Sequence, residues 1–378
     1  MHSLEQKLRE ELIQRKTAGL LRELPHNKDL IDFCSNDYLS WARDESLKTS
    51  VLRNFQNNQF HIGASGSRLI SGNSSFAEEL EQKIASFHRA DAALIFNSGY
   101  DANVGFFSAV PKRGDTVLYD ELIHASIRDG IRLGLAKSFS FRHNDVDDLK
   151  KKISKSEGGV FVVVESVYSM DGDAAPLIEL SQMVQEHGIH LIVDEAHSAG
   201  VDGLNGEGKV VELGIEKKVF ARLITYGKAF GAHGAAVLGS IVLKEYMINF
   251  CRSFIYTTFC SDFSLVAIDG VYQRKQEIAQ RSKMVHELKH YFLQHLESKK
   301  LKSEFIASES LIQSFLVGNN GRCRELEKQM KERGFAVKAI LSPTVPAGTE
   351  RVRISLHYHN TPEQIDELCE ILSHFLNN

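Results

Sequence analysis

The sequence predicts an α/β fold in which a mostly parallel central sheet is sandwiched between helices. In the middle of the chain, short apolar runs alternate with amphipathic helical stretches, the order expected of a helix-covered parallel sheet. The run Val160–Val164 is continuously apolar, as in strands that are buried on both faces. A length of 378 residues allows one large domain and a smaller one.

Residues 3–24 have leucines near helical spacing and predict an N-terminal helical arm. A second helix is expected from about Ser75 to Arg89, and a third over Pro176–His187, where proline stands near the helix start. The predicted strands of the sheet are Ala92–Phe96, Thr116–Tyr119, Val160–Val164, His190–Val193, Val219–Thr225 and Val237–Val242.

The pattern changes after about residue 260. A long helical pattern covers Leu265–Ser298, and shorter elements follow at Ile312–Val317, Arg322–Arg333, Val352–Leu356 and Pro362–Leu376. These features predict a smaller C-terminal α+β domain. We therefore expect an N-terminal arm over 1–45, a large domain over 46–260 and a small domain over 261–378.

Composition excludes several classes of protein. A formal net charge of -4 gives no global attraction for nucleic acid or an anionic membrane. The five cysteines form no C-x-x-C pair, which argues against zinc and a disulfide framework, so we expect no metal. The charged N-terminus lacks the apolar core of a signal peptide, and no apolar run reaches the ~20 residues needed to cross a bilayer. These features predict a soluble, cytoplasmic protein.

Reactive side chains follow several of the predicted strands. Because ligands of open α/β sheets bind beyond the carboxyl ends of the strands, we expect these groups to meet there. Asp194 ends one strand, Lys228 follows another, and Asn97–Tyr100 lead from a strand into a helix whose free N–H groups could hold a phosphate. His124 supplies a flat ring for stacking, and Glu165 and Ser169 follow Val160–Val164.

This set of groups predicts a site for pyridoxal 5'-phosphate. The aldehyde of that cofactor forms an imine with a lysine, here Lys228, whose amine becomes a nucleophile when its pKa is lowered. The pyridine nitrogen needs a nearby acid, here Asp194, so that the ring can accept electrons. Asp194 could instead cap a helix or pair with an arginine, and Lys228 by itself would be an ordinary surface lysine.

An ordered set of motifs strengthens this interpretation. The chain resembles the α-oxoamine synthases, which are pyridoxal-phosphate enzymes of fold type I, over nearly its whole length. The matching runs are Ser35–Leu39, Gly66–Leu69 with Ser71–Gly72, Asn97–Tyr100, Asp120–Ser126, His143–Asp145, Glu165–Asp173, Asp194–Gly200, Thr225–Phe230, Ile255–Thr258 and Pro343–Ile354.

The resemblance assigns roles to individual residues. It implies that Lys228 forms the imine and moves the α-proton, that Asp194 pairs with the ring nitrogen and that His124 stacks on the ring. The remaining implied cofactor contacts are Ser98, Gly99, Tyr100, Ser169, His197, Thr225 and, reaching a partner subunit, Thr257 and Thr258. For the substrates, it implies Asn36, Arg353 for the amino-acid carboxylate and Arg22 for the acyl end. Arg351 would share a strand face with Arg353 and stays an alternative.

The resemblance also implies the reaction. A family member of this kind is a homodimeric acyltransferase that condenses an amino acid with an acyl-CoA and releases coenzyme A and CO2. The expected substrates are L-alanine and pimeloyl-CoA, as in biotin synthesis. Members that use glycine or serine remain alternatives, because a methyl group in a pocket is worth only ~1 to 3 kcal/mol. An alternative of another class is a pyridoxal-phosphate sensor without turnover.

The chain departs from the family pattern at two places, and two of its motifs resemble those of unrelated proteins. Ala77 stands where the family usually has a histidine, and Phe259–Asp262 replaces a Pro-Pro segment. Asp194–His197 spells the DEAH box of helicases, and Gly203–Val210 nearly spells a phosphate-binding loop. However, Val210 replaces the hydroxyl that binds magnesium, and the two motifs occur in the wrong order. A nucleotidase is therefore disfavoured.

Overall fold

The computed structural model describes residues 3–377, which form two compact units. The larger unit comprises residues 36–169 and 173–286. The smaller unit comprises the chain up to Ser35, residues 170–172 and the chain from Glu287 onwards. None of the helices in the described part of the chain is both long and apolar enough to span a bilayer.

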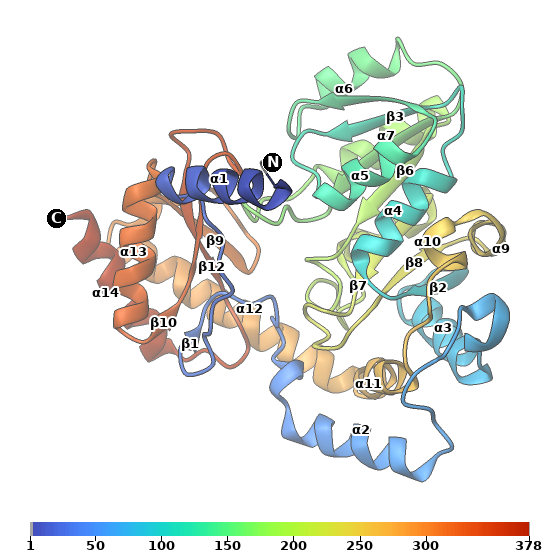
Figure 1. The fold of residues 1–378 in the computed structure, drawn as a ribbon, viewed down its shortest axis with the longest axis horizontal. Coiled ribbons are helices and arrows are strands. Elements are labelled where there is room, and N and C mark those ends of the chain that lie inside the picture. Colours follow the sequence, from blue (N-terminus) through green and yellow to red (C-terminus); the bar gives the residue numbers. More distant parts are fainter. Residues whose placement is uncertain (1–2, 378) are drawn as a thin grey trace. The chain divides into compact units, whose positions relative to one another are not determined.

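The larger unit is built on a seven-stranded sheet with the strand order β2-β8-β7-β6-β5-β3-β4 (Figure 1). Only β8 runs antiparallel to its neighbours, so the prediction of a mostly parallel sheet is confirmed. The strands are β2 (Ala92–Phe96), β3 (Thr116–Asp120), β4 (Lys137–Phe141), β5 (Val160–Glu165), β6 (His190–Asp194), β7 (Ala221–Thr225) and β8 (Ala235–Gly239).

The sheet separates two apolar cores, because successive side chains of a strand point to opposite faces. Along β6, Ile192 belongs to one core, together with Phe106 and Met247 of the covering helices. Leu191 and Val193 belong to the other core. The strands buried on both faces are therefore continuously apolar in sequence.

Helices cover both faces of this sheet. Those of the larger unit are α2 (Glu45–Asn57), α3 (Ser75–Phe87), α4 (Gly99–Ala109), α5 (Ala125–Leu133), α6 (Val146–Ile153), α7 (Leu177–His187), α8 (Lys209–Glu212), α9 (Ile241–Phe250), α10 (Arg252–Ile255), α11 (Asp262–Tyr272) and the first part of α12 (Lys275–Ser298).

Two predicted elements differ from those observed. The expected strand Val237–Val242 ends at Gly239, because Ser240 caps a helix by accepting the N–H of Leu243 at 3.1 Å. The expected helix Leu265–Ser298 is two helices, α11 and α12.

The smaller unit contains a three-stranded antiparallel sheet with the order β11-β12-β9 and a two-stranded parallel pair, β1 with β10. Its elements are α1 (Leu4–Thr17), β1 (Ile31–Asp32), β9 (Ile312–Leu316), α13 (Asn320–Glu332), β10 (Phe335–Ala336), β11 (Lys338–Ile340), β12 (Arg351–Ser355), α14 (Pro362–Leu376) and the second part of α12. A capping box formed by Thr361 and Gln364 begins α14.

The division into units differs from the predicted domain boundaries. The units divide at 35/36 and at 286/287, inside α12, and the domain bounds expected from the sequence, at 45/46 and 260/261, stay predictions. Helix α11 belongs to the larger unit because it packs on α2, so close that a Cβ on Gly270 would lie 3.1 Å from Leu47 and 3.2 Å from Val51. The predicted helix over 3–24 is α1, which ends at Thr17.

Candidate active site

A cavity of about 170 Å³ lies in the larger unit, among side chains that follow the carboxyl ends of β3, β5, β6 and β7. This is the edge at which open α/β sheets bind ligands. The cavity brings together most of the predicted site. Its lining residues are Gly99, Tyr100, Asn103, His124, Ser126, Glu165, Asp194, Ala196, His197, Leu223, Ile224, Thr225 and Lys228.

Asp194 is held firmly at the end of β6. Its Oδ1 accepts the backbone N–H of Ala196 at 2.9 Å, and its Oδ2 accepts Nδ2 of Asn103 at 3.0 Å. Asn103 also donates to the hydroxyl of Ser126 at 3.0 Å. Asp194 is 5% exposed, and both carboxylate oxygens have donors, which suits a carboxylate that stays ionised in a buried site.

Lys228 and His197 form the first part of a hydrogen-bonded chain across the cavity. Nζ of Lys228 lies 2.7 Å from Nε2 of His197, and Nδ1 of His197 lies 2.7 Å from the hydroxyl of Tyr38. The Tyr38 hydroxyl in turn donates to Oδ1 of Asn36 at 3.2 Å. With Tyr38 donating to Asn36, His197 carries its proton on Nδ1 and accepts from Lys228 through Nε2.

His124 is fixed as the N-cap of α5. Its Nδ1 lies 2.7 Å from the hydroxyl of Ser126, which orients the ring towards the cavity. Burial lowers the pKa of His124, the charge of Asp194 opposes this shift, and the charge of Lys228 adds to it. A neutral imidazole is the form suited to stacking on a flat ligand.

The far end of the cavity is formed by the start of α4 and the end of β7. Ser98 is the N-cap of α4, accepting the N–H of Asp101 at 3.1 Å. A Cβ on Gly99 would lie 3.6 Å from Thr225, so these two predicted phosphate-end residues are adjacent. The free N–H groups of an 11-residue helix favour an anion at this point. Tyr100 lines the cavity, and its hydroxyl donates to Asp129 at 2.6 Å.

Four predicted cofactor contacts do not line this cavity, namely Ser98, which directly precedes Gly99, and Ser169, Thr257 and Thr258. Thr257 and Thr258 lie beside Asn97, whose Nδ2 donates to the hydroxyl of Thr257 at 3.2 Å and to the carbonyl oxygen of Thr258 at 2.6 Å. Ser169 is half-buried, and its backbone N–H donates to Glu165. The roles inferred for these residues stay predictions.

The predicted substrate residues divide between the units. Asn36 lies in the larger unit and accepts from Tyr38. Arg351 and Arg353 lie on β12 of the smaller unit and are 5% and 7% exposed. The guanidinium of Arg351 binds the carboxylate of Asp171 and, through Nε, the carbonyl oxygen of Thr349. Arg351 is thus held by residues of its own unit, and the assignment of the amino-acid carboxylate to Arg353 stays a prediction.

Arg22 lies in the smaller unit and lines a broad groove of about 790 Å³. Apolar residues such as Leu30 and Phe335 form part of this groove. Its cationic members are Arg15, Arg22, Arg324, Lys328, Lys331 and Lys338. The groove therefore suits a ligand that has both an apolar and an anionic part.

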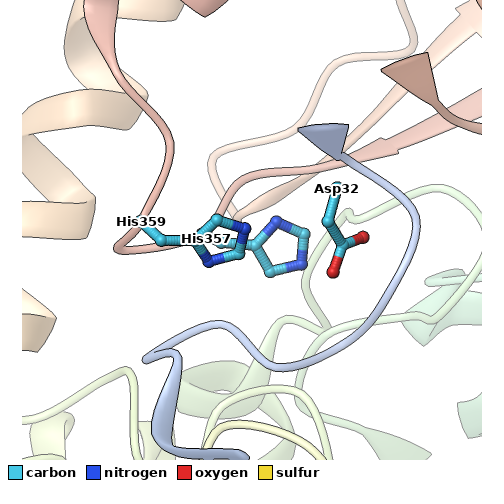
Figure 2. A group of neighbouring side chains, drawn as sticks. All are labelled: Asp32, His357 and His359. Carbon is cyan, nitrogen blue, oxygen red and sulfur yellow. The ribbon is translucent and has the colours of Figure 1, made fainter. Parts of the chain in front are cut away.

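A cluster of possible metal ligands, Asp32, His357 and His359, lies in the smaller unit (Figure 2). The two imidazole rings stack with centroids 4.9 Å apart and planes inclined by 24°, so their in-plane lone pairs do not converge on one point. Oδ1 of Asp32 accepts the N–H of Cys34 and Ser35 at 2.9 Å each. Nε2 of His357 lies 3.0 Å from the carbonyl oxygen of Ser35. We interpret this cluster as a structural network.

The structure also explains the two motifs that resemble those of unrelated proteins, Asp194–His197 and Gly203–Val210. Glu195 of the DEAH sequence is fully buried, pairs with Arg222 and accepts the N–H of Val210 at 2.9 Å. Within Gly203–Val210, the backbone at Gly208 has a φ of 105°, and a Cβ there would lie 2.7 Å from Glu195. This loop therefore closes over a buried carboxylate and does not form a phosphate cradle.

Sequence reasoning did not assign four residues of the site, which are Tyr38, Asn103, Ser126 and Glu165. Tyr38 stands inside a matched motif, and Glu165 ends an apolar strand, so both carried a signal in the sequence. Ser126 also ends a matched run, whereas Asn103 lies on a helix where nothing in the sequence distinguishes it from a capping or surface residue. Their positions beside Asp194 emerge only from the packing of α4 against α5.

The fold and the cavity together define a fold type I transferase. The chain belongs to the Aminotransferase class I and II family, which it matches over residues 28–372. It is 39% identical to an 8-amino-7-oxononanoate synthase of Emericella nidulans, over 99% of this chain and 96% of that protein.

Two solved structures show the same architecture. The 8-amino-7-oxononanoate synthase of Francisella tularensis is 29% identical, with a TM-score of 0.79 over 92% of this chain and 98% of that one. A serine palmitoyltransferase from S. paucimobilis with bound PLP and myriocin is 25% identical, with a TM-score of 0.89 over 100% of this chain and 98% of that one. The resemblance stated from the sequence motifs is confirmed.

Proposed function

We propose that this protein is an acyltransferase that binds pyridoxal 5'-phosphate in the cavity of the larger unit. The observation that carries the proposal is that one cavity holds an amine, Lys228, a fixed carboxylate, Asp194, and a flat ring, His124. The start of α4 offers free N–H groups for the phosphate. When bound, this cofactor withdraws electrons from the α-carbon of an amino acid.

The residues of the chain then have distinct tasks. Lys228 attaches the cofactor and, once released from it, moves the proton at the α-carbon of the substrate. Asp194 keeps the ring nitrogen protonated, and its two donors prevent it from rotating away. His197 accepts a hydrogen bond from Lys228 at Nε2, while Tyr38 fixes the tautomer through Nδ1. His124 covers one ring face and limits access of water.

The substrates we propose are L-alanine and pimeloyl-CoA, whose condensation with loss of CO2 is a step of biotin synthesis. The support is the 39% identity to a full-length relative that is named 8-amino-7-oxononanoate synthase. In this proposal, Arg353 binds the carboxylate of the amino acid, with Asn36 helping to position it, and Arg22 binds the distal carboxylate of the acyl chain.

Two relatives of the same class define the alternatives. Compared with the 8-amino-7-oxononanoate synthase structure, the serine palmitoyltransferase structure has a higher TM-score with this chain but a lower sequence identity. The two similarities favour different substrates, so both the amino acid and the acyl chain are to be tested directly. A glycine-using relative, such as 2-amino-3-ketobutyrate CoA ligase, would use the same cavity. A sensor that binds the cofactor without turnover is the alternative of another class.

We also propose a cytoplasmic homodimer with shared active sites. Helix α1 supports this proposal, because Leu4, Leu8, Leu12 and Ile13 are each at least half exposed on it. Such side chains are typical of a surface that another copy covers. Thr257 and Thr258 would then contact the phosphate in the partner's site.

The function is tested by a matrix of L-alanine, glycine and L-serine against pimeloyl-CoA, acetyl-CoA and palmitoyl-CoA. The release of free thiol reports turnover, and mass spectrometry identifies the aminoketone. We expect the highest kcat/KM for L-alanine with pimeloyl-CoA. A preference for serine with palmitoyl-CoA would replace the proposed substrates, and binding of the cofactor without thiol release in any combination would indicate a sensor.

A further inference from the structure

Glu165 is a buried carboxyl group for which the mechanism above has no task. It ends β5, is 3% exposed and lines the cavity. The backbone N–H groups of His124 and Ser169 donate to it; His124 ends the loop between β3 and α5, and Ser169 lies in the loop after β5. Its Oε1 atom is buried without a hydrogen-bond partner. An unsatisfied buried polar atom of this kind calls for an explanation.

Glu165 is also the register partner of Asp194. The two residues end neighbouring parallel strands and are paired at the Cα level, so their side chains point to the same face of the sheet. Two carboxyl groups placed in this way do not both ionise easily, since like charges in a buried site repel. Both oxygens of Asp194 have donors, whereas Oε1 of Glu165 has none. Glu165 is therefore the member of the pair that keeps a proton.

We propose that Glu165 is a positioning residue that carries a proton at neutral pH, ties the loops of His124 and Ser169 to the sheet and leaves Asp194 as the single anion of the carboxyl pair. One oxygen accepts the two backbone N–H groups, and the other carries the hydroxyl proton into the cavity. The direction of the pKa agrees, because burial, followed by the charge of Asp194, raises the pKa of Glu165 to about 8.

The charged and titratable groups around Glu165 come from every element that packs against it. Tyr168 lies in the loop after β5, the strand that Glu165 ends. Asp194 and His197 come from β6 and its loop, His124 from the loop after β3, and Lys228 from the segment after β7. Lys228 opposes the shift, but its effect on the pKa of Glu165 is smaller than that of Asp194. The inference deepens the proposed function and rests on it, because the one carboxylate that remains ionised, Asp194, would be the partner of the ring nitrogen.

The proton on Glu165 can be tested in the full chain freed of cofactor. The variant Glu165→Gln keeps the shape and the neutral charge of a protonated acid, and Glu179→Gln removes a 54% exposed carboxylate of the same unit as a control. A carboxyl group whose pKa is raised by folding loses stability as pH rises, because the unfolded chain releases the proton first. We expect the unfolding free energy of the wild type to fall, relative to Glu165→Gln, between about pH 5 and pH 8. Glu179→Gln should follow the wild type.

Infrared spectroscopy gives a second readout, which does not depend on the stability of the protein. A protonated carboxylic acid band at pH 7 should disappear from the wild type as pH rises through about 8, and it should be missing in Glu165→Gln. An ionised Glu165 at pH 7, or a wild-type stability that rises relative to Glu165→Gln over this range, overturns the proposal. Glu165→Gln should also bind pyridoxal 5'-phosphate within about threefold of the wild type at pH 7, and a tenfold loss counts against a neutral Glu165. If neither protein binds the cofactor, the proposed function fails while the first two readouts still decide on Glu165.

Discussion

Nζ of Lys228 lies 2.7 Å from Nε2 of His197. This contact joins a residue that follows β7 to one that follows β6, and it continues through Nδ1 of His197 to Tyr38. The order of donors makes His197 an acceptor towards Lys228. The amine that we propose attaches the cofactor is therefore oriented by a histidine whose tautomer is set from the opposite side.

The role of Tyr38 can be tested by Tyr38→Phe. This change removes the hydroxyl that fixes the tautomer of His197 and leaves the packing of a side chain that is 1% exposed. We expect kcat to fall by about 10- to 100-fold, as for other residues that orient a reactive group from behind. The pH dependence of the visible cofactor band should shift as well. An unchanged pH profile would show that Tyr38 serves packing alone.

Asp194→Asn tests the partner of the ring nitrogen. Asparagine keeps the size of the side chain and its bond from the N–H of Ala196, but it cannot hold a proton on the ring nitrogen. We expect the variant to bind pyridoxal 5'-phosphate and to lose turnover by on the order of 100-fold or more. The measurement is cofactor content beside steady-state kcat. Near-normal turnover with full cofactor content would exclude the assigned role.

Arg353 and Arg351 are distinguished by comparing two alanine variants. Arg353→Ala should raise the KM of the amino acid at least about tenfold while the KM of the acyl-CoA changes little, because a guanidinium bound to a carboxylate is a strong pair. Arg351→Ala leaves Asp171 without its partner and should cost about 3 kcal/mol of stability. If the amino-acid KM responds to Arg351→Ala instead, the carboxylate binds there.

His143 makes a prediction about stability and pH. Burial alone lowers its pKa, but hydrogen bonds to Asp120 and Asp173, at 2.9 Å and 2.6 Å, outweigh this and raise it to about 10. Because folding raises this pKa, the contribution is full below about pH 6.5 and is lost as pH rises through about 10. Chemical unfolding at pH 7 and pH 10 should therefore show a larger loss for the wild type than for His143→Gln. Equal losses would mean that His143 is not charged at pH 7.

The central sheet could be predicted because the burial of each central strand is visible in the apolar residues of that strand alone. Val160–Val164 and Leu191–Val193 are apolar throughout, and strands of this kind are typically buried on both faces. β4 was not predicted, because Lys137–Phe141 is an exposed edge strand whose pairing with β3 depends on the tertiary fold. The break between α11 and α12 was missed because residues 273–277 contain no glycine or proline that would signal it.

A site residue could be predicted from the sequence where it follows a predicted strand, because the ends of the parallel strands meet at one edge of the sheet. Lys228, Asp194 and His124 were found in this way, and the structure brings all three to one cavity. Glu165 was noted but given no role, because its meaning depends on the register with Asp194, which sequence spacing does not reveal. The contact of Arg351 with Asp171, which lies 180 residues away in the chain, was likewise not predictable from sequence spacing.

The most direct test of the account is to locate the cofactor on the chain. Purified protein is incubated with excess pyridoxal 5'-phosphate, reduced with borohydride, digested and mapped by mass spectrometry, with Lys228→Ala treated in parallel. The account predicts one modified peptide, labelled at Lys228, and no visible band in the variant. A label on another lysine, or a visible band that survives in Lys228→Ala, would contradict it.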